Sequence, residues 1–447
     1  MSVFSVFSAA AVSAQTNPAQ TKKDVPPVLD RYLQTNDGAY KWELAEPIKT
    51  PVPNGKLFLL ELTSQKWHSY TWKHYLLVAV PAKAEYKDHA LMYVTLGRIG
   101  QKPNKLTDFL MAAMLANQAS MPIAVLYQVP NQPLDIRKTA KNDGDWCEDD
   151  LIAESLLKAV ETKDPTWAIL LPMTKSVIKA MNAVQEFLKK EHSLDVKKFI
   201  VGGASKRGWT TWLVGASQDP RVAGLVPIIY NNLNLPAQMA YQIESWNDFS
   251  PRIREYTSRQ LFRKGEKPSG FQAEIMQIID PYTYRNRITV PKLLVHGAND
   301  PYWTTDATKW YWKDIQEPKF LLTIPNVGHQ DIDRPDNLQK VIPTVGFFCQ
   351  YVAMHGEWPS SDWNVQVKKK EYLISVETEI PGAKRILWTA AAADNHFEQA
   401  KWQSKDCGDA EKISVPKPAT GRIAFFVELQ AEQLGTRFSI TTEVWRY

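Results

Sequence analysis

The stretch VGGASKRGW, residues 201–209, contains the serine on which the interpretation of this sequence depends. It ends the apolar run KKFIVGGAS and begins a run with helical spacing, which predicts that Ser205 lies on a strand-to-helix turn. The strained turn of a nucleophilic serine usually has glycine two residues before and two residues after it. Here Gly203 is in place, but Arg207 holds the second position and Gly208 follows one residue later. A serine that only caps the following helix is the alternative.

Two further predicted strands end in residues that could complete a catalytic triad with Ser205. Asp300 ends the run LLVHGAND, and His329 follows the run LLTIPNVGH 29 residues later (329 − 300). A serine hydroxyl needs a base to take its proton, and that base needs an acid to orient it. The order serine, aspartate, histidine is that of α/β-hydrolases, which predicts Ser205 as nucleophile, His329 as base and Asp300 as orienting acid. A turn aspartate and a packed histidine remain the alternatives, and Asp306 is a second candidate acid.

An oxyanion hole must supply donors beside this serine. The backbone N–H of Lys206 is the expected first donor, since Lys206 follows the nucleophile. The loop after YVTLGRIG is expected to supply the second, from Gly97, Arg98 or Ile99.

The substrate pocket is expected to include residues close to the three strand ends. Tyr302 and Trp303 follow Asp300 and are predicted to shape the pocket. Lys206 and Arg207 could favour an anionic group on the substrate, and helix-surface ion pairing is the alternative for both. The acidic cluster 148–150 could bind a cation or an amine, although a charge cluster at a helix N-terminus is the better interpretation.

The wider pattern predicts an α/β fold with a doubly wound, mostly parallel sheet. Strands of continuous apolar character alternate with helical runs, as in sheets buried on both faces. Ligands then bind at the carboxyl ends of the strands. Residues 304–316 and 336–355 are expected to be helical, and residues 131–166 a polar connection. We predict an α/β-hydrolase domain at 29–360, with a helical cap at about 231–290, and an immunoglobulin-like β-sandwich at 361–447.

The N-terminal residues indicate export. Residues 1–14 contain a short apolar run and end in the A-x-A-like Val12-Ser13-Ala14, which is typical of a signal peptide, although no basic residue precedes the run. Residues 15–28 are polar and contain proline, as in a linker. The protein is therefore expected to be periplasmic or secreted. No other apolar, uncharged stretch reaches about 18 residues, so no membrane span is expected.

Composition argues against several classes of function. The formal charge of +5 (53 − 48) is spread through 447 residues without a basic tract, so nucleic acid is not an expected partner. Cys147, Cys349 and Cys407 lie far apart, show no metal-ligand spacing and could form at most one disulfide. The sequence implies no metal and no organic cofactor.

Several stretches resemble the PhoPQ-activated pathogenicity-related family. They are LTSQKW (62–67), GASKRGWTTWLVGASQDPRVAGLVPIIYNNLN (203–234), HGANDPYW (296–303), VGH (327–329) and FSITTEVW (438–445). The resemblance implies an α/β-hydrolase-like fold and export, and leaves the substrate open. The turn around Ser205 is also similar to that of glucuronoyl esterases, which implies that the basic Lys206 contributes to the oxyanion hole.

These observations lead to two hypotheses about function. The first is an exported serine hydrolase that cleaves a small-molecule ester, or a peptide or amide, through an acyl-enzyme. Among substrate classes, a peptidase or a broad esterase is favoured over a carbohydrate esterase. The second is a secreted binding or signalling protein on a hydrolase scaffold, with the C-terminal β domain as the site of a protein partner.

Overall fold

The computed structural model describes residues 25–45, 48, 55–103, 106–137, 146–354, 356 and 359–447. The predicted signal peptide 1–14 lies outside these residues, as do linker residues 15–24. Within them, no helix has the length and apolar character needed to cross a membrane.

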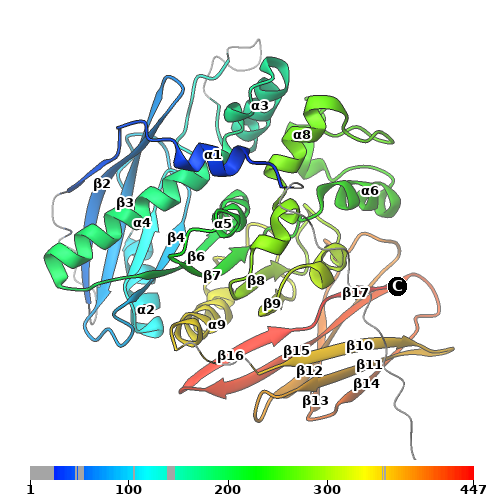
Figure 1. Cartoon of the computed structure of the whole chain (residues 1–447). Helices are drawn as coiled ribbons and strands as arrows, with labels where there is room; N and C mark the ends of the chain where they lie inside the picture. Colours follow the sequence, from blue (N-terminus) through cyan, green and yellow to red (C-terminus); the bar gives the residue numbers. More distant parts are fainter. Residues whose placement is uncertain are drawn as a thin grey trace, which may run out of the picture.

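A nine-stranded, mostly parallel sheet forms the centre of the described part of the molecule (Figure 1). Its order is β1-β2-β3-β5-β4-β6-β7-β8-β9, in which β1, β2 and β3 are antiparallel and β5, β4 and β6 to β9 run parallel. The strands are β1 Lys41–Leu44, β2 Gly55–Trp67, β3 Tyr70–Pro81, β4 His89–Val94, β5 Ile123–Leu126, β6 Lys198–Ala204, β7 Val222–Ile228, β8 Lys292–Gly297 and β9 Lys319–Ile324. The sheet therefore has the predicted doubly wound α/β arrangement, and its carboxyl ends present one common edge.

Helices cover both faces of this sheet. Neighbouring residues of β6 separate the two layers, since Val201 packs with the helices of one face and Ile200 with those of the other. The first layer contains α1 Val28–Gln34, α3 Glu148–Thr162, α4 Leu170–His192 and α5 Lys206–Ala216, and the second contains α2 Leu106–Ala119 and α9 Pro335–Ala353. Helix α3 lies where a polar connection was expected, so that expectation was wrong. Its buried Leu151, Ile152 and Leu156 show the apolar spacing that the neighbouring charges obscured.

A helical cap connects β7 to β8, as expected. It consists of α6 Leu235–Trp246, α7 Arg254–Thr257, α8 Gly270–Ile279 and two 3₁₀ turns, Pro251–Ile253 and Pro281–Arg287. The helix expected at 304–316 is absent, and two 3₁₀ turns, Ala307–Trp310 and Trp312–Asp314, stand in its place. Thr308 and Tyr311 both donate hydroxyl hydrogen bonds to Asn231 Oδ1, at 3.2 and 2.6 Å, and these tertiary contacts take precedence over helical spacing.

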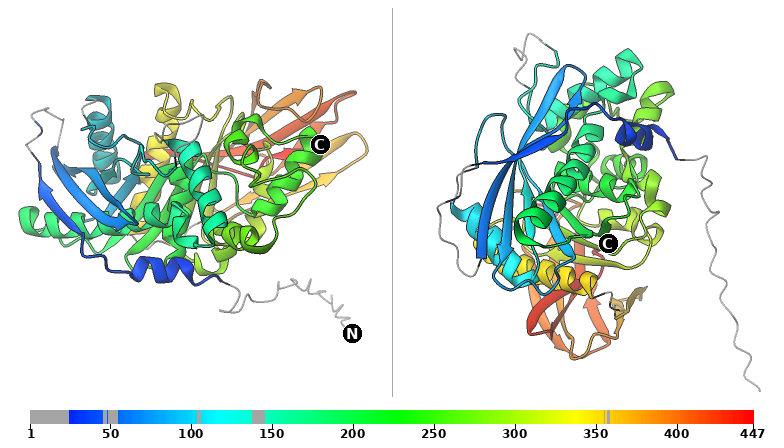
Figure 2. Two further views of the ribbon diagram at one scale, coloured as in Figure 1. Left: turned by 90° about the horizontal axis from the view of Figure 1, so that it is seen from above. Right: turned by 60° about the vertical axis from the view of Figure 1, so that its left-hand side comes forward.

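The C-terminal part is an antiparallel β-sandwich. One sheet contains β10 Ser361–Val367, β11 Glu371–Thr378 and β14 Lys412–Pro416; the other contains β13 Gln403–Gly408, β12 Lys384–Ala392, β15 Arg422–Gln433, β16 Thr436–Thr441 and β17 Trp445–Arg446. The sandwich lies at the end of the molecule opposite β1–β3 (Figure 2).

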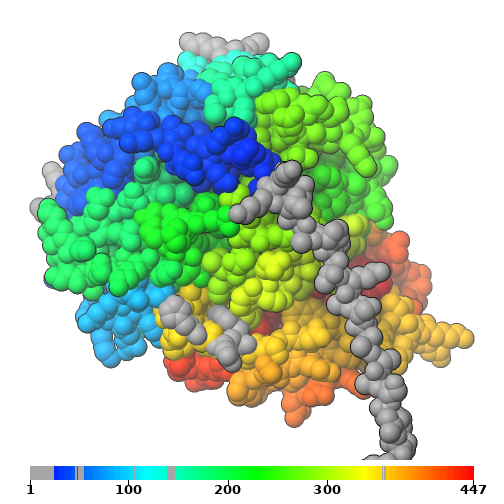
Figure 3. All heavy atoms as spheres, in the orientation of Figure 1, coloured from blue at the N-terminus to red at the C-terminus, as the bar shows by residue number. Residues whose placement is uncertain are grey.

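The sandwich and the large sheet share one apolar core. Strand β16 packs on α9 and β9, and buried Phe347 of α9 stacks on Phe438 of β16 with ring centroids 3.9 Å apart. Thr441 Oγ1 also accepts a 3.0 Å hydrogen bond from the N–H of Thr323 in β9. The surface of the C-terminal segment is accordingly continuous with that of the part built on the large sheet (Figure 3).

Candidate active site

Ser205 lies on a sharp turn between β6 and α5. Its backbone has φ 57° and ψ −124°, a conformation that residues other than glycine rarely adopt and that tends to occur at functional sites. The Ser205 N–H donates to the carbonyl of Ile228 at 2.8 Å, which ties the turn to the end of β7. The hydroxyl does not cap α5, which answers the alternative raised by the sequence.

Two glycines make this turn sterically possible. A Cβ atom on Gly203 would lie 2.9 Å from the Cβ of Arg207. A Cβ atom on Gly208 would lie 2.9 Å from the carbonyl oxygen of Ile228 and 3.1 Å from that of Gly203. The two 2.9 Å distances are too short for a real Cβ atom, so the displaced Gly208 lets α5 pack closely against β6 and β7.

The structure brings Ser205, His329 and Asp300 together at the carboxyl edge of the sheet. His329 follows β9, and its Nδ1 lies 2.7 Å from Asp300 Oδ2 while its Nε2 lies 2.8 Å from Ser205 Oγ. Asp300 follows β8, and its second oxygen accepts the Tyr302 N–H at 2.9 Å, which fixes the carboxylate. The Tyr302 ring packs against the imidazole with centroids 4.2 Å apart. A base poised between a hydroxyl and a buried acid can activate that hydroxyl as a nucleophile.

Asp306, the second candidate acid, has other partners. Its Oδ2 accepts from the Tyr241 hydroxyl at 2.6 Å and from Lys309 at 3.0 Å. Its Oδ1 lies 3.3 Å from the guanidinium of Arg446 in β17. Asp306 therefore joins the cap to the C-terminal strand and does not orient His329.

Lys206 and Arg207 belong to a charge cluster with the acidic start of α3. Arg207 forms two hydrogen bonds to Glu148, at 2.7 and 2.8 Å, and Lys206 Nζ lies 2.9 Å from Glu148 and 3.2 Å from Asp149. Burial alone would raise the pKa of Glu148, but the charges of Arg207 and Lys206 hold it well below its usual range. Two positive and two negative groups balance, so the cluster offers no net charge to an anionic substrate.

The remaining predicted residues have different positions. Arg207 lies behind the turn, and its guanidinium is directed to Glu148 and the carbonyl of Val129. It therefore lines neither of the two cavities that lie beside the Ser205–His329–Asp300 series, described below. Gly97 and Arg98 follow β4, which pairs with β6 next to Ser205, but they line neither cavity either. The Ile99 N–H already donates to the Gln132 carbonyl at 2.6 Å.

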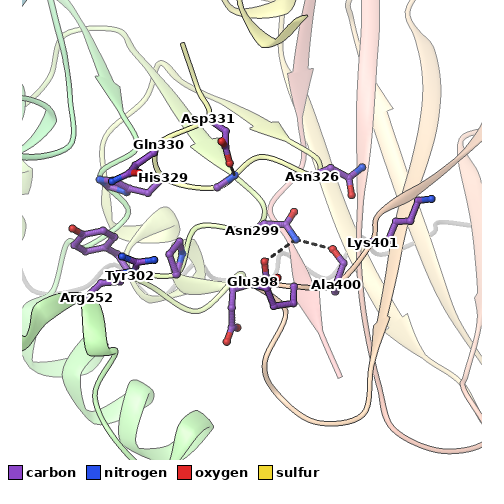
Figure 4. A pocket seen from close by; sticks show the side chains of 13 residues that line it. Arg252, Asn299, Tyr302, Asn326, His329, Gln330, Asp331, Glu398, Ala400 and Lys401 are labelled. Atoms are coloured by element: carbon purple, nitrogen blue, oxygen red, sulfur yellow. Dashed lines mark hydrogen bonds between the residues drawn. The ribbon is translucent and has the colours of Figure 1, made fainter. Parts of the chain in front are cut away.

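Two cavities lie beside the Ser205–His329–Asp300 series, and Tyr302 lines both of them. The smaller, of about 40 Å³, has Ser205, Lys206, Tyr302 and Trp303 in its wall, together with side chains of the cap. The larger, of about 450 Å³, extends from His329 and Tyr302 to the C-terminal sandwich (Figure 4).

Cap residues that the sequence did not single out close the smaller cavity. They are Leu235, Met239, Ile253, Tyr256 and Phe262, joined by Asp149, Trp209, Tyr230 and Asn232. Tyr230 Oη and Asn232 Oδ1 are buried and find no hydrogen-bond partner among the described residues, so they are available to a bound molecule. The run YNNLN (230–234) after β7 was the available signal, since it places polar residues at a strand end.

The three cysteines also lie within the described ranges. No disulfide joins them there.

Comparison with known proteins places the chain in a recognised group. The family model described as PhoPQ-activated pathogenicity-related protein matches residues 29–397. The Autocrine proliferation repressor protein A of Dictyostelium discoideum is 29% identical over 93% of this chain and 87% of its own length.

Solved structures show weaker similarity. The acetyl xylan esterase 1 of Thermoanaerobacterium has a TM-score of 0.49 at 14% identity, over 73% of this chain and 94% of that one. The acylaminoacyl peptidase of Pyrococcus horikoshii has a TM-score of 0.43 at 14% identity, over 68% of this chain and 49% of that one.

Proposed function

The chain belongs to the PhoPQ-activated pathogenicity-related family, and we propose that it is an exported serine hydrolase that cleaves an ester or amide through an acyl-enzyme. The observation that carries this proposal is the hydrogen-bonded series Ser205–His329–Asp300 on a strained turn at the carboxyl edge of the sheet. A serine that only stabilises the fold needs neither a positive φ nor a histidine paired with a buried aspartate behind it.

The proposed reaction has two steps. His329 Nε2 takes the Ser205 proton as Oγ attacks the substrate carbonyl, and Asp300 stabilises the resulting imidazolium. His329 then gives that proton to the leaving oxygen or nitrogen. Water attacks the acyl-enzyme in the same way and regenerates Ser205.

The oxyanion of the tetrahedral intermediate needs donors on the Ser205 side. We assign the first to the Lys206 N–H, since Lys206 lines the smaller cavity. Gly97 and Arg98 follow β4 beside β6 but line neither cavity, so the second donor at one of them stays a prediction from the sequence. Lys206 lines the smaller cavity, and its ammonium group is held by Glu148 and Asp149. The cluster as a whole is neutral, so any contact of Lys206 with the developing charge is a local one beside Ser205.

Labelling with a fluorophosphonate probe tests the nucleophile. We expect the wild type to be labelled and Ser205→Ala to remain unlabelled while folded. Ser404→Ala, at an exposed position of β13, is the matched control and should label like the wild type. A folded wild-type protein that does not react would contradict the proposal. If the wild type is labelled, a second assay separates esterase from peptidase activity. It measures release of p-nitrophenol from esters and of p-nitroaniline from peptide anilides.

Export is part of the proposal and rests on the A-x-A-like end of residues 1–14. N-terminal sequencing of the protein recovered outside the cytoplasm should begin at Gln15.

The regulatory name of the Dictyostelium relative favours a second candidate, a secreted signalling protein. This hypothesis predicts that Ser205→Ala retains the biological effect of the wild type in a proliferation assay. If the protein is instead a hydrolase whose reaction product carries the signal, Ser205→Ala should lose the biological effect.

A further inference from the structure

Two cavities of very different size share Tyr302 as a common wall beside the proposed catalytic histidine. The smaller, of about 40 Å³, has Ser205 in its wall, and the larger, of about 450 Å³, has His329 in its wall. Tyr302 lines both, with its ring 4.2 Å from the imidazole. A substrate bound across Ser205 and His329 therefore places a small group in the smaller cavity and a large group in the larger one.

The chemistry of the proposed reaction decides which group goes where. The acyl carbon must bond to Ser205 Oγ, whereas the departing oxygen must receive the proton held by His329 Nε2. The acyl group therefore belongs to the small cavity on the serine side. The alcohol belongs to the cleft on the histidine side, whose volume lies within the ~300–1,000 Å³ of ordinary ligand pockets.

The lining of the large cleft is polar and balanced in charge. Arg252 and Lys401 contribute two positive groups, and Asp331 and Glu398 contribute two negative groups. Gln330 adds an amide that both donates and accepts hydrogen bonds. A hydroxyl group also donates and accepts, so a ligand rich in hydroxyls matches this mixture, whereas a polyanion or a polycation would meet like charge.

The C-terminal sandwich supplies one wall of the cleft, and two asparagines fix that wall (Figure 4). Asn299, after β8, donates from Nδ2 to the carbonyls of Phe397 and Ala400 at 3.1 and 2.7 Å. Asn326, after β9, accepts the Trp402 N–H at 2.8 Å and donates to the Trp402 carbonyl at 3.1 Å. Residues 398–401 are thus held in place in the wall of the cleft that also contains His329, as a preformed binding site requires.

We propose that this cleft is the alcohol subsite of the hydrolase and that it takes a polyhydroxylated alcohol, such as a sugar, esterified by a small acyl group. The inference rests on the proposed function. In the first step the Ser205 Oγ–acyl bond forms and the ester C–O bond breaks, and the sugar oxygen leaves with the proton that His329 took from Ser205. Water then releases the acid, so no further reactant is needed.

The test compares substrates that share the acetyl group and differ in the alcohol. They are p-nitrophenyl acetate, ethyl acetate and an acetylated methyl glucoside, with acetate release measured for each. We expect the wild type to have a kcat/KM for the acetylated sugar at least roughly tenfold above that for ethyl acetate, the value of about one hydrogen bond.

Substitutions in the cleft sharpen this test. Gln330→Ala and Lys401→Ala change exposed lining residues and should lower kcat/KM for the acetylated sugar roughly tenfold more than for p-nitrophenyl acetate. Lys405→Ala, exposed on β13 outside the cleft, is the matched control and should change neither.

The outcomes separate the two proposals. Equal losses on both substrates, or no preference for the sugar ester, would overturn the alcohol subsite while leaving the hydrolase intact. Cleft variants that impair only a neutral peptide anilide would show that a peptide occupies the cleft, and would also overturn it. An unlabelled Ser205 with no turnover of p-nitrophenyl acetate would instead remove the proposed function itself.

Discussion

At the scale of single residues, Asp300 and Asp306 lie six positions apart (306 − 300) and have different partners. Asp300 holds the imidazole of His329, while Asp306 holds the guanidinium of Arg446. Asp300 is therefore placed as the proposed orienting acid of His329, whereas Asp306 joins distant parts of the chain.

Asparagine at each position should separate these roles. Asp300→Asn should lower kcat/KM for p-nitrophenyl acetate by roughly ten-thousandfold, because the amide favours the wrong imidazole tautomer, with little change in stability. Asp306→Asn should leave activity per folded molecule near the wild type and lower the free energy of unfolding by about 3–5 kcal/mol, since it leaves Arg446 buried without its charge partner. Steady-state kinetics and urea unfolding measure the two effects, and the reverse pattern would exchange the roles.

Gly208 provides a second prediction at this scale. Gly208→Ala forces a methyl group to within 2.9 Å of the Ile228 carbonyl oxygen and 3.0 Å of the Tyr230 Cβ. We expect about 1–3 kcal/mol of destabilisation from overpacking, together with slower fluorophosphonate labelling, because the turn that carries Ser205 must shift. Gly224→Ala, whose new Cβ would meet side chains no closer than 3.3 Å, should have a smaller effect on both measurements.

The sequence was informative about residues whose chemistry depends on strand ends. Ser205, Asp300 and His329 could be predicted together because parallel strands bring their carboxyl ends to one edge. Arg207 was harder to interpret, because its partner Glu148 lies 59 residues earlier (207 − 148) and no local pattern connects them. The positions of Gly97 and Arg98 depend on how the loop after β4 folds against residues 126–132, which spacing does not indicate.

At the scale of elements, a buried histidine connects β3 to its neighbours. His74 is 3% exposed, and its Nε2 lies 3.0 Å from Ser64 Oγ of β2 while its Nδ1 lies 2.9 Å from the carbonyl of Tyr127. Ser64 in turn lies 3.1 Å from Ser176 of α4, which links the antiparallel strands to the helix layer.

Burial lowers the pKa of His74 to about 4, against an ordinary value of 6.5. Between these values the unfolded chain binds the proton and the folded protein does not, so stability rises with pH and is lost as pH falls below 6.5. His74 should therefore contribute about 2 kcal/mol of stability at pH 7.5 that is absent at pH 5.

Urea unfolding of His74→Gln at the two pH values tests this. The variant should lose about 2 kcal/mol less than the wild type on acidification. Lys405→Gln, at an exposed position of β13, is the control and should follow the wild type. Equal pH dependence in all three proteins would contradict the prediction.

Elements with continuous apolar runs could be predicted because burial on both faces leaves a clear pattern. Helix α3 could not, since its first turn contains Glu148, Asp149 and Asp150 and three more charged residues lie along its length. The segment 304–316 has helical spacing, but contacts to Asn231 hold it in two short turns. The first error therefore comes from charges that obscure the apolar spacing of α3, and the second from tertiary contacts that local sequence does not encode.

At the scale of the whole molecule, the sandwich and the large sheet are joined by buried polar contacts as well as by a shared core. Arg446 of β17 is 5% exposed at its side chain and donates to the Asn395 carbonyl at 3.1 Å and to Ser245 of α6 at 2.6 Å, besides its ion pair with Asp306. One side chain therefore contacts the cap, the loop after β8 and the sandwich.

Arg446→Met should remove this connection. We expect the free energy of unfolding to fall by about 1–3 kcal/mol, because Asp306 Oδ1 loses the cation that faces it while Lys309 still pairs with Oδ2. Arg437→Met, at a side chain 89% exposed on β16, should change stability by less than about 0.5 kcal/mol. Calorimetry should show that Arg446→Met lowers the temperature of one unfolding transition. The proposed esterase activity should be lost at that same transition. A separate, earlier transition of the sandwich alone would contradict the shared core.

The displaced glycine of the Ser205 turn has a consequence for the identification of related proteins in genomes. The pentapeptide G-x-S-x-G occurs nowhere in this chain, so a scan for it would miss the protein. The close approach of α5 to β7 requires glycine three residues after the serine, which frees the position before it for an arginine. A search that asks for G-x-S-x-x-G, followed by an aspartate and then a histidine at later strand ends, would retrieve such chains from uncharacterised sequence.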